Sequence, residues 1–167
     1  MPSQEAHQEA EAAAILVLSR SNPRNLRSAI VVARQHSREV GVRRLVEEAE
    51  ALGVDTSGQI ALPEFVRDYR RAERIARKYQ RSELTDAAKE RIAVTESSEA
   101  FSSGRSAFAR GFHHPSLIKV WNAERDACPV CYSADGYMVG IHENFPLGEP
   151  GSVHPFCRCY WDLLSEQ

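Results

Sequence analysis

The sequence predicts an α+β fold, in which an N-terminal helical region is followed by a small β-rich zinc-binding module. Apolar residues recur at three- and four-residue steps through most of residues 1–111, which is the spacing of packed helices. In residues 112–167 this pattern is replaced by short β-like segments, which are separated by turns that contain Gly and Pro. All four cysteines lie between Cys128 and Cys159. We therefore divide the chain into a helical region, 1–111, and a zinc-stabilised module, 112–167.

Length, charge and hydropathy exclude several classes of protein. The 167 residues carry a formal net charge of -2, so global charge does not predict a nucleic-acid partner. The longest apolar run, 12–18, is too short to cross a bilayer, and acidic residues precede it, unlike in a signal peptide. We expect a protein that has no membrane partner and stays in the cytoplasm, or in a particle assembled there, where structural disulfides are disfavoured.

Breaks in the apolar pattern divide the first region into helices. Residues 4–18 are rich in Ala and Glu and favour a helix, which the stretch 19–23 ends. The pattern resumes over 24–52, where Gly41 is expected to bend the helix and Gly53 to cap it. A loop is expected to follow over 54–61.

Two more helices are expected before the module. Pro63 suits the first position of a third helix. Ser82 or Thr85 suits the cap of a fourth helix that runs to about residue 110, which Gly104 is expected to weaken.

The expected third helix combines an apolar stripe with a basic face. The stripe contains Phe65, Tyr69, Ala72, Ala76 and Tyr79. The basic residues are Arg67, Arg70, Arg71, Arg74, Arg77, Lys78 and Arg81. Such a face suits DNA phosphates or an acidic partner, and a solvated helix surface is the alternative.

The module is expected to contain strands at 117–121, 137–141 and 157–164, with an extended loop over 144–153. Four aromatic side chains are expected to form its small core: Trp121, Phe156, Tyr160 and Trp161.

Two short motifs bring metal-binding residue types together. The first is Cys128-Pro-Val-Cys131, and the second is His154-Pro-Phe-Cys157-Arg-Cys159. A CxxC turn directs two thiolates at one ion, and a second cluster can complete a tetrahedron. Thiolate ligands favour zinc over magnesium or calcium, and a set dominated by thiols favours a structural over a catalytic site.

The spacing leaves the ligand set open, because five candidates compete for about four positions. Cys157 and Cys159 share a face if their segment is a strand, which allows a four-cysteine site. Alternatively, His154 and one of these cysteines bind the ion. The alternative to a metal site is that the cysteines form disulfides or remain free thiols.

Two charged residues flank the expected ligands. Asp126 precedes Cys128 by two residues, and Arg158 lies between two ligands and should point to the other side of its strand. We expect Arg158 to pair with Asp126 or Glu124 and so to support the site from outside.

The same residues resemble those of a phage protein family. The stretch Ile92-Ala-Val94-Thr-Glu96, with Ala100, Gly104 and Arg105, and the order Trp121, Asp126, CxxC, Gly136 and HPxCRC are similar to Mu F-type minor head proteins of tailed phages. The resemblance covers about residues 85–162. It departs from the family at Val94, where the family usually has Arg, and at Asn122, where Thr is frequent.

The resemblance implies a virion protein that acts in head morphogenesis, DNA packaging or ejection. It implies the phage portal or major capsid protein as a partner, with DNA as a further candidate, a structural Zn²⁺, no small-molecule substrate and assembly in the host cytoplasm.

Two other classes of function remain as alternatives. A nuclease or toxin-like domain would use His113, His114, Asp126 or Arg158, although these residues show no recognised catalytic spacing and a linker turn explains the histidine pair. A zinc-ribbon adaptor would bind nucleic acid through the basic helix. The chain lacks a Gly-rich phosphate loop, GxSxG and HExxH, so we expect no enzyme.

Overall fold

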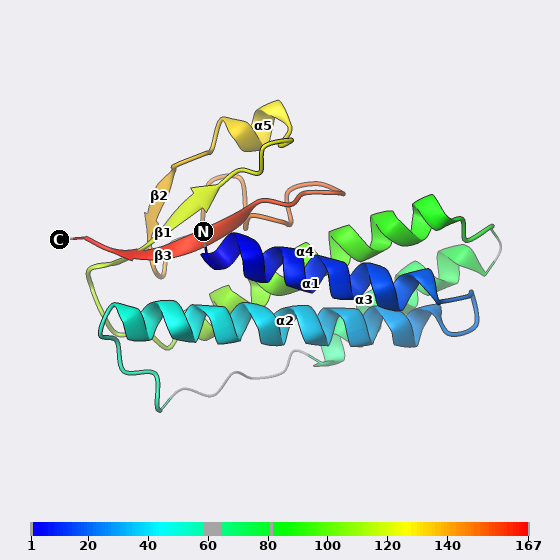
Figure 1. Cartoon of the computed structure of the whole chain (residues 1–167), viewed down its shortest axis with the longest axis horizontal. Helices are drawn as coiled ribbons and strands as arrows, with labels where there is room; N and C mark the ends of the chain where they lie inside the picture. The colour runs from blue at the N-terminus through cyan, green and yellow to red at the C-terminus, as the bar shows by residue number, and fades with distance from the viewer. Residues whose placement is uncertain (1, 59–64, 81, 167) are drawn as a thin grey trace.

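The computed structural model describes residues 2–58, 65–80 and 82–166, and it confirms the α+β fold (Figure 1). Long helices form the body of the molecule, and a three-stranded antiparallel sheet lies against one end of them. The helices are α1 (Pro2–Ser19), α2 (Leu26–Ala51), α3 (Phe65–Tyr79), α4 (Asp86–Ala109) and the short α5 (Pro129–Tyr132). The strands are β1 (Leu117–Asn122), β2 (Met138–Gly140) and β3 (Tyr160–Ser165). Among the described residues, no helix is both long enough and apolar enough to cross a bilayer.

Helix ends follow the local signals of the sequence. The Thr85 hydroxyl accepts a hydrogen bond from the backbone N–H of Ala88, which makes Thr85 the cap of α4. Gly53 adopts a φ of +77° directly after α2, as a C-terminal capping glycine should. The predicted start of the third helix at Pro63 lies outside the described residues.

Gly41 of α2 and Gly104 of α4 have a packing role that the sequence did not suggest. Both α2 and α4 run unbroken, and the two glycines lie where these helices pack together. A Cβ atom at Gly41 would stand 2.7 Å from the carbonyl oxygen of Phe101, and one at Gly104 would overlap the side chain of Arg38. The missing side chains therefore allow two backbones to approach closely.

The helices enclose a network of buried charges that the sequence did not suggest. It consists of the guanidinium groups of Arg34, Arg38 and Arg71 and the carboxylates of Asp68, Glu96 and Glu99. Arg34 donates hydrogen bonds to Asp68 and Glu96, each with a donor–acceptor distance of 2.7 Å. Arg71 donates to Glu96 at 2.6 Å. Glu99 also pairs with Arg34. Arg71, which we expected on an exposed basic face, is half-buried and belongs to this network.

The prediction of an apolar stripe on α3 is only partly confirmed. Ala72, Ala76 and Tyr79 are buried in an apolar cluster that also contains residues of α1, α2 and α4, whereas Tyr69 is 40% exposed. The side chain of Phe65 lies outside the described residues. The stripe therefore faces the bundle from Ala72 onward.

The sheet has the strand order β2-β1-β3, and its inner face packs on the helices. Trp121 of β1 lies opposite Trp161 of β3, and both indoles are fully buried. They share one apolar cluster with Leu45 of α2 and Phe108 of α4. Phe156 is the exception among the expected core aromatics, because it is 40% exposed.

His7 of α1 is buried where the helices meet the sheet. Its ring stacks on Tyr160, contacts Phe101 edge to face, and lies 3.0 Å from the Ser98 hydroxyl. Burial, together with the positive charges of Arg158 and Arg105, lowers the pKa of His7 to about 4. His7 is therefore neutral in the folded protein near neutral pH.

Adding a methyl group at Gly41 should destabilise the fold. We expect Gly41→Ala to lower the free energy of unfolding by about 1–3 kcal/mol, because the clash with Phe101 outweighs the better helix propensity of Ala. Urea titrations measure this change. Gly58→Ala is the control, because a Cβ there meets nothing within 4 Å. A Gly41→Ala protein as stable as the parent would contradict the close packing.

His7 should make the protein acid-sensitive. The unfolded chain binds a proton at His7 below its ordinary pKa of 6.5, whereas the folded chain does so only near 4. The contribution of His7 to stability is therefore complete above pH 6.5 and falls as the pH drops toward 4. When the pH is lowered from about 7 to 4.5, the free energy of unfolding of His7→Gln should fall by about 2 kcal/mol less than that of the parent. His114→Gln, at an exposed histidine, is the control variant.

Candidate metal centre

The CxxC motif forms a tight turn that starts a short helix. Cys128 is the N-cap of α5, and its Sγ accepts a hydrogen bond from the backbone N–H of Cys131 at 3.5 Å. Pro129 occupies the first helical position, where its fixed φ suits the turn. This local geometry turns both sulfurs to the same side.

The second motif lies in an irregular loop and not in a strand. The structure corrects the predicted strand over 157–164, since β3 begins at Tyr160. The loop is tethered to α4, because the N–H of Phe156 donates to the Thr95 hydroxyl and Gly151 approaches the backbone of Ser98. Phe156 itself has a φ of +64°, which bends the chain between His154 and Cys157.

His154 presents its Nε2 atom to the thiols. Its Nδ1 atom lies 2.7 Å from the carbonyl oxygen of Pro155, which fixes the ring and places the Nδ1 proton in that hydrogen bond. Nε2 is then 3.2 Å from Cys128 Sγ and 3.3 Å from Cys131 Sγ. A histidine ligand is commonly oriented by such a backbone partner.

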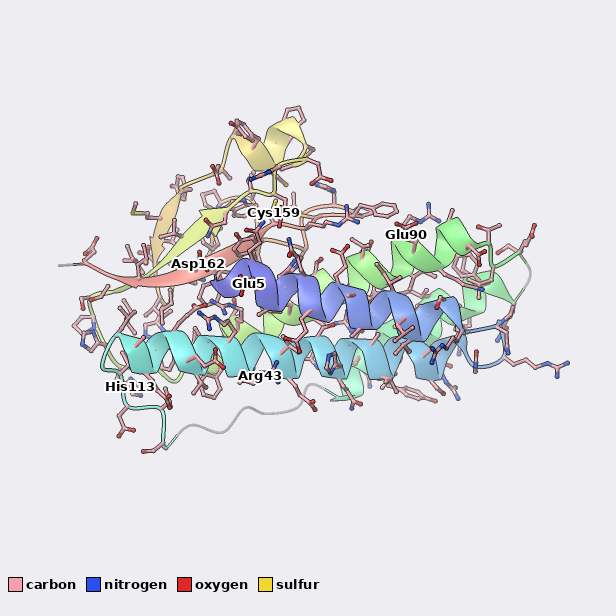
Figure 2. The ribbon with its side chains drawn as sticks, viewed as in Figure 1. Glu5, Arg43, Glu90, His113, Cys159 and Asp162 are labelled. Carbon is pink, nitrogen blue, oxygen red and sulfur yellow. The ribbon has the colours of Figure 1, made fainter. Side chains whose placement is uncertain are left out.

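Five side chains meet as two overlapping groups that share Cys131; Figure 2 labels one of the five, Cys159. Cys128, Cys131 and His154 form one group, and Cys131, Cys157 and Cys159 form the other, with donor atoms within 4.8 Å of one another in each. The sulfurs of Cys131 and Cys157 are 3.8 Å apart. Tetrahedral ligands with metal–sulfur bonds of about 2.3 Å stand about 3.8 Å apart. The cluster is therefore compatible with a metal site, and all four thiols are free.

The thiols differ in acidity because of their surroundings. Hydrogen bonding from Cys159 lowers the pKa of Cys157 to about 5, although burial opposes this shift. Burial, together with the negative charge on Cys157, raises the pKa of Cys131 to about 12. Binding a cation at Cys131 therefore releases a proton, so metal affinity should rise with pH.

Charged residues brace the cluster from outside. Arg158 lies 3.5 Å from Asp126, which is one of the two partners expected from the sequence. It also contacts Glu11 of α1 at 2.9 Å, a partner that sequence reasoning missed because 147 residues separate the two. Glu124, the other expected partner, instead approaches Gln4 at 3.3 Å.

The remaining predicted site residues lie elsewhere. His113 and His114 are exposed in the turn between α4 and β1, and His114 contacts Ser116. Figure 2 shows His113 well away from Cys159, which adjoins Arg158. On α3, the side chains at Arg70, Arg74, Arg77 and Lys78 are exposed. The side chain of Arg67 and the whole of Arg81 lie outside the described residues.

Comparisons with protein-family models, with curated proteins and with solved structures gave no match to this chain.

The shared position of Cys131 makes its loss decisive for metal binding. We expect the purified protein to hold one soft divalent ion per chain, and Cys131→Ser to hold none, because Cys131 belongs to both groups. Elemental analysis after gel filtration measures the ratio. His154→Ala should weaken retention if His154 is a ligand, whereas His142→Ala, at an exposed histidine outside the cluster, should not. A metal-free parent protein would contradict the site.

Proposed function

We propose that the chain is a minor head protein of a tailed phage, whose sheet and loops are held by one structural Zn²⁺. The observation that carries this proposal is the meeting of the CxxC turn with the HPxCRC loop, the two motifs on which the resemblance depends. A thiol-dominated set, of which Cys131, Cys157 and Cys159 are buried, suits a closed zinc site that stabilises a fold.

Other residues of the resemblance also have structural roles here, which supports the proposal. Arg105 is fully buried and pairs with Glu48 at 2.7 Å. Gly136 turns the chain into β2 with a φ of +74°, which disfavours a side chain. At the departure from the family, Val94 is fully buried, so this chain places an apolar group where the family has Arg.

A protein partner is supported by apolar side chains exposed on the module. Tyr132 of α5 is 65% exposed, Met138 of β2 is 60% exposed, and Val130 and Tyr137 are about half exposed. Exposed apolar groups gathered on one small module are typical of protein contact surfaces. We propose that the portal or the major capsid protein covers them in the assembled head.

A nuclease is less well supported than a structural role. His113 and His114 lie away from the Asp126–Arg158 pair, so these residues do not form one constellation in the described chain. General acid–base catalysis needs such groups within hydrogen-bond reach of a common atom.

Incorporation into phage heads tests the proposal. We expect mass spectrometry of particles made from the encoding genome to find the parent chain in few copies. Cys131→Ser should abolish incorporation, because the module loses the shape that zinc maintains. His113→Ala/His114→Ala should incorporate normally, because neither histidine belongs to the cluster. Heads that form normally and never contain the parent chain would refute the proposal.

A further inference from the structure

The exposed face of α3 carries a row of cations. One of them, Lys78, has its Nζ atom 5.9 Å from the ring centroid of Tyr79. Arg70, Arg74 and Lys78 follow one another at four-residue steps, so they lie on the same side of the helix. All three are exposed, and within the described part of the chain none of them forms an ion pair with a carboxylate. Arg77 lies on the same face and pairs with Glu73 at 2.8 Å.

A second helix extends this row. Arg27 of α2 is exposed, and its guanidinium lies 5.0 Å from the ring centroid of Tyr69, at the start of α3. The cation–π contact holds Arg27 beside the α3 row and limits its freedom. We call Arg27, Tyr69, Arg70, Arg74 and Lys78 the basic face. It joins residues that are 51 positions apart at most.

The basic face has an electrostatic cost to the folded chain. Like charges four residues apart on a helix repel each other and destabilise it. Arg27 also lies in the first turn of α2, where the helix dipole disfavours a cation and where no acidic residue compensates it. Only Lys78, in the last turn of α3, is favoured by the dipole. Uncompensated repulsion between the cations of the basic face suggests that an anion binds to this face.

The composition of the basic face favours phosphate over other anions. Arginine presents a planar fork that bonds two phosphate oxygens at once, and three of its four cations are arginines. The centres of protein–protein interfaces are depleted of charge, whereas interfaces with nucleic acid are polar and strongly positive. A membrane surface would instead call for an apolar face beside the cations.

We infer that the basic face binds the phosphodiester backbone of nucleic acid without sequence preference. The net charge of the chain is -2, so this attraction comes from the local arrangement of cations and not from the whole molecule. The basic face belongs to α2 and α3 and shares no residue with the Cys/His cluster, so the inference does not depend on the proposed zinc site.

Fluorescence anisotropy with a labelled DNA duplex of about 30 base pairs tests the inference over about 50–200 mM salt. Two duplexes of unrelated sequence should bind the parent chain equally. Arg70→Gln/Arg74→Gln should weaken binding about tenfold or more and make the slope of log K against log salt less negative by about 2, because two phosphate contacts are lost. Gln retains good helix propensity, so circular dichroism should show an unchanged helix content.

Arg110→Gln/Arg125→Gln is the matched control. Both arginines are exposed, form no ion pair within the described chain and lie outside the basic face, so this variant removes the same charge. Its affinity should stay within about twofold of the parent value. Equal weakening by both variants would overturn the inference, as would the absence of DNA binding at low salt. Binding to anionic lipid vesicles or to polyglutamate without binding to DNA would also overturn it.

Discussion

The placement of the sheet on the helices depends on one buried ion pair. Arg105 of α4 is fully buried, and it donates to the carboxylate of Glu48 at 2.7 Å and to the carbonyl oxygen of Trp161 at 3.0 Å. Glu48 in turn accepts a hydrogen bond from the N–H of Leu163 and one from the hydroxyl of Ser3. These bonds connect α1, α2, α4 and β3. Removing one partner of such a pair leaves an uncompensated charge in a dry site, which typically costs about 3–5 kcal/mol.

The same physical solution recurs in the middle of the bundle. Arg34 is nearly inaccessible to water, and the carboxylates around it raise its pKa, although burial itself acts in the opposite direction. Asp68 lies between Arg34 and Arg38, and these two cations hold its pKa below the ordinary value in spite of its burial. Long helices with little apolar surface can pack around buried charges only if each arginine lies beside a carboxylate of a neighbouring helix. The network therefore specifies which helix faces meet, in addition to any effect on stability.

Local chemistry allowed much of the fold to be predicted from the sequence. A capping threonine, a capping glycine and a change from helical to strand-like spacing depend on neighbouring residues, so Thr85, Gly53 and the three strands could be located. The Cys/His cluster was predictable for the same reason, since each motif is short. The choice of four ligands was not, because it depends on how the loop carrying Cys157 and Cys159 is bent and not on a strand period.

Long-range contacts explain the failures. The sequence places Arg71 on the basic face of the third helix, and only the approach of Glu96 from α4 shows that it joins a buried network. Asp68 of the same helix is buried beside Arg34 of α2. The packing role of Gly41 could not be predicted, because it depends on the backbone of Phe101, which is 60 positions away. The ion pair between Arg158 and Glu11 could not be predicted either, because Glu11 lies near the other end of the chain.

The shared core determines how a metal ion would act on the whole molecule. The inner face of the sheet and Cys131 belong to one apolar cluster with Leu45 and Phe108 of the long helices. An ion at the Cys/His cluster would fix the turn at Cys128 relative to the loop that α4 holds through Thr95. Its stabilising effect would therefore pass into α2 and α4 through packed side chains, because a close-packed core transmits displacement. The apolar groups exposed on the module would then be presented from a rigid base, which lowers the entropy cost of binding a partner.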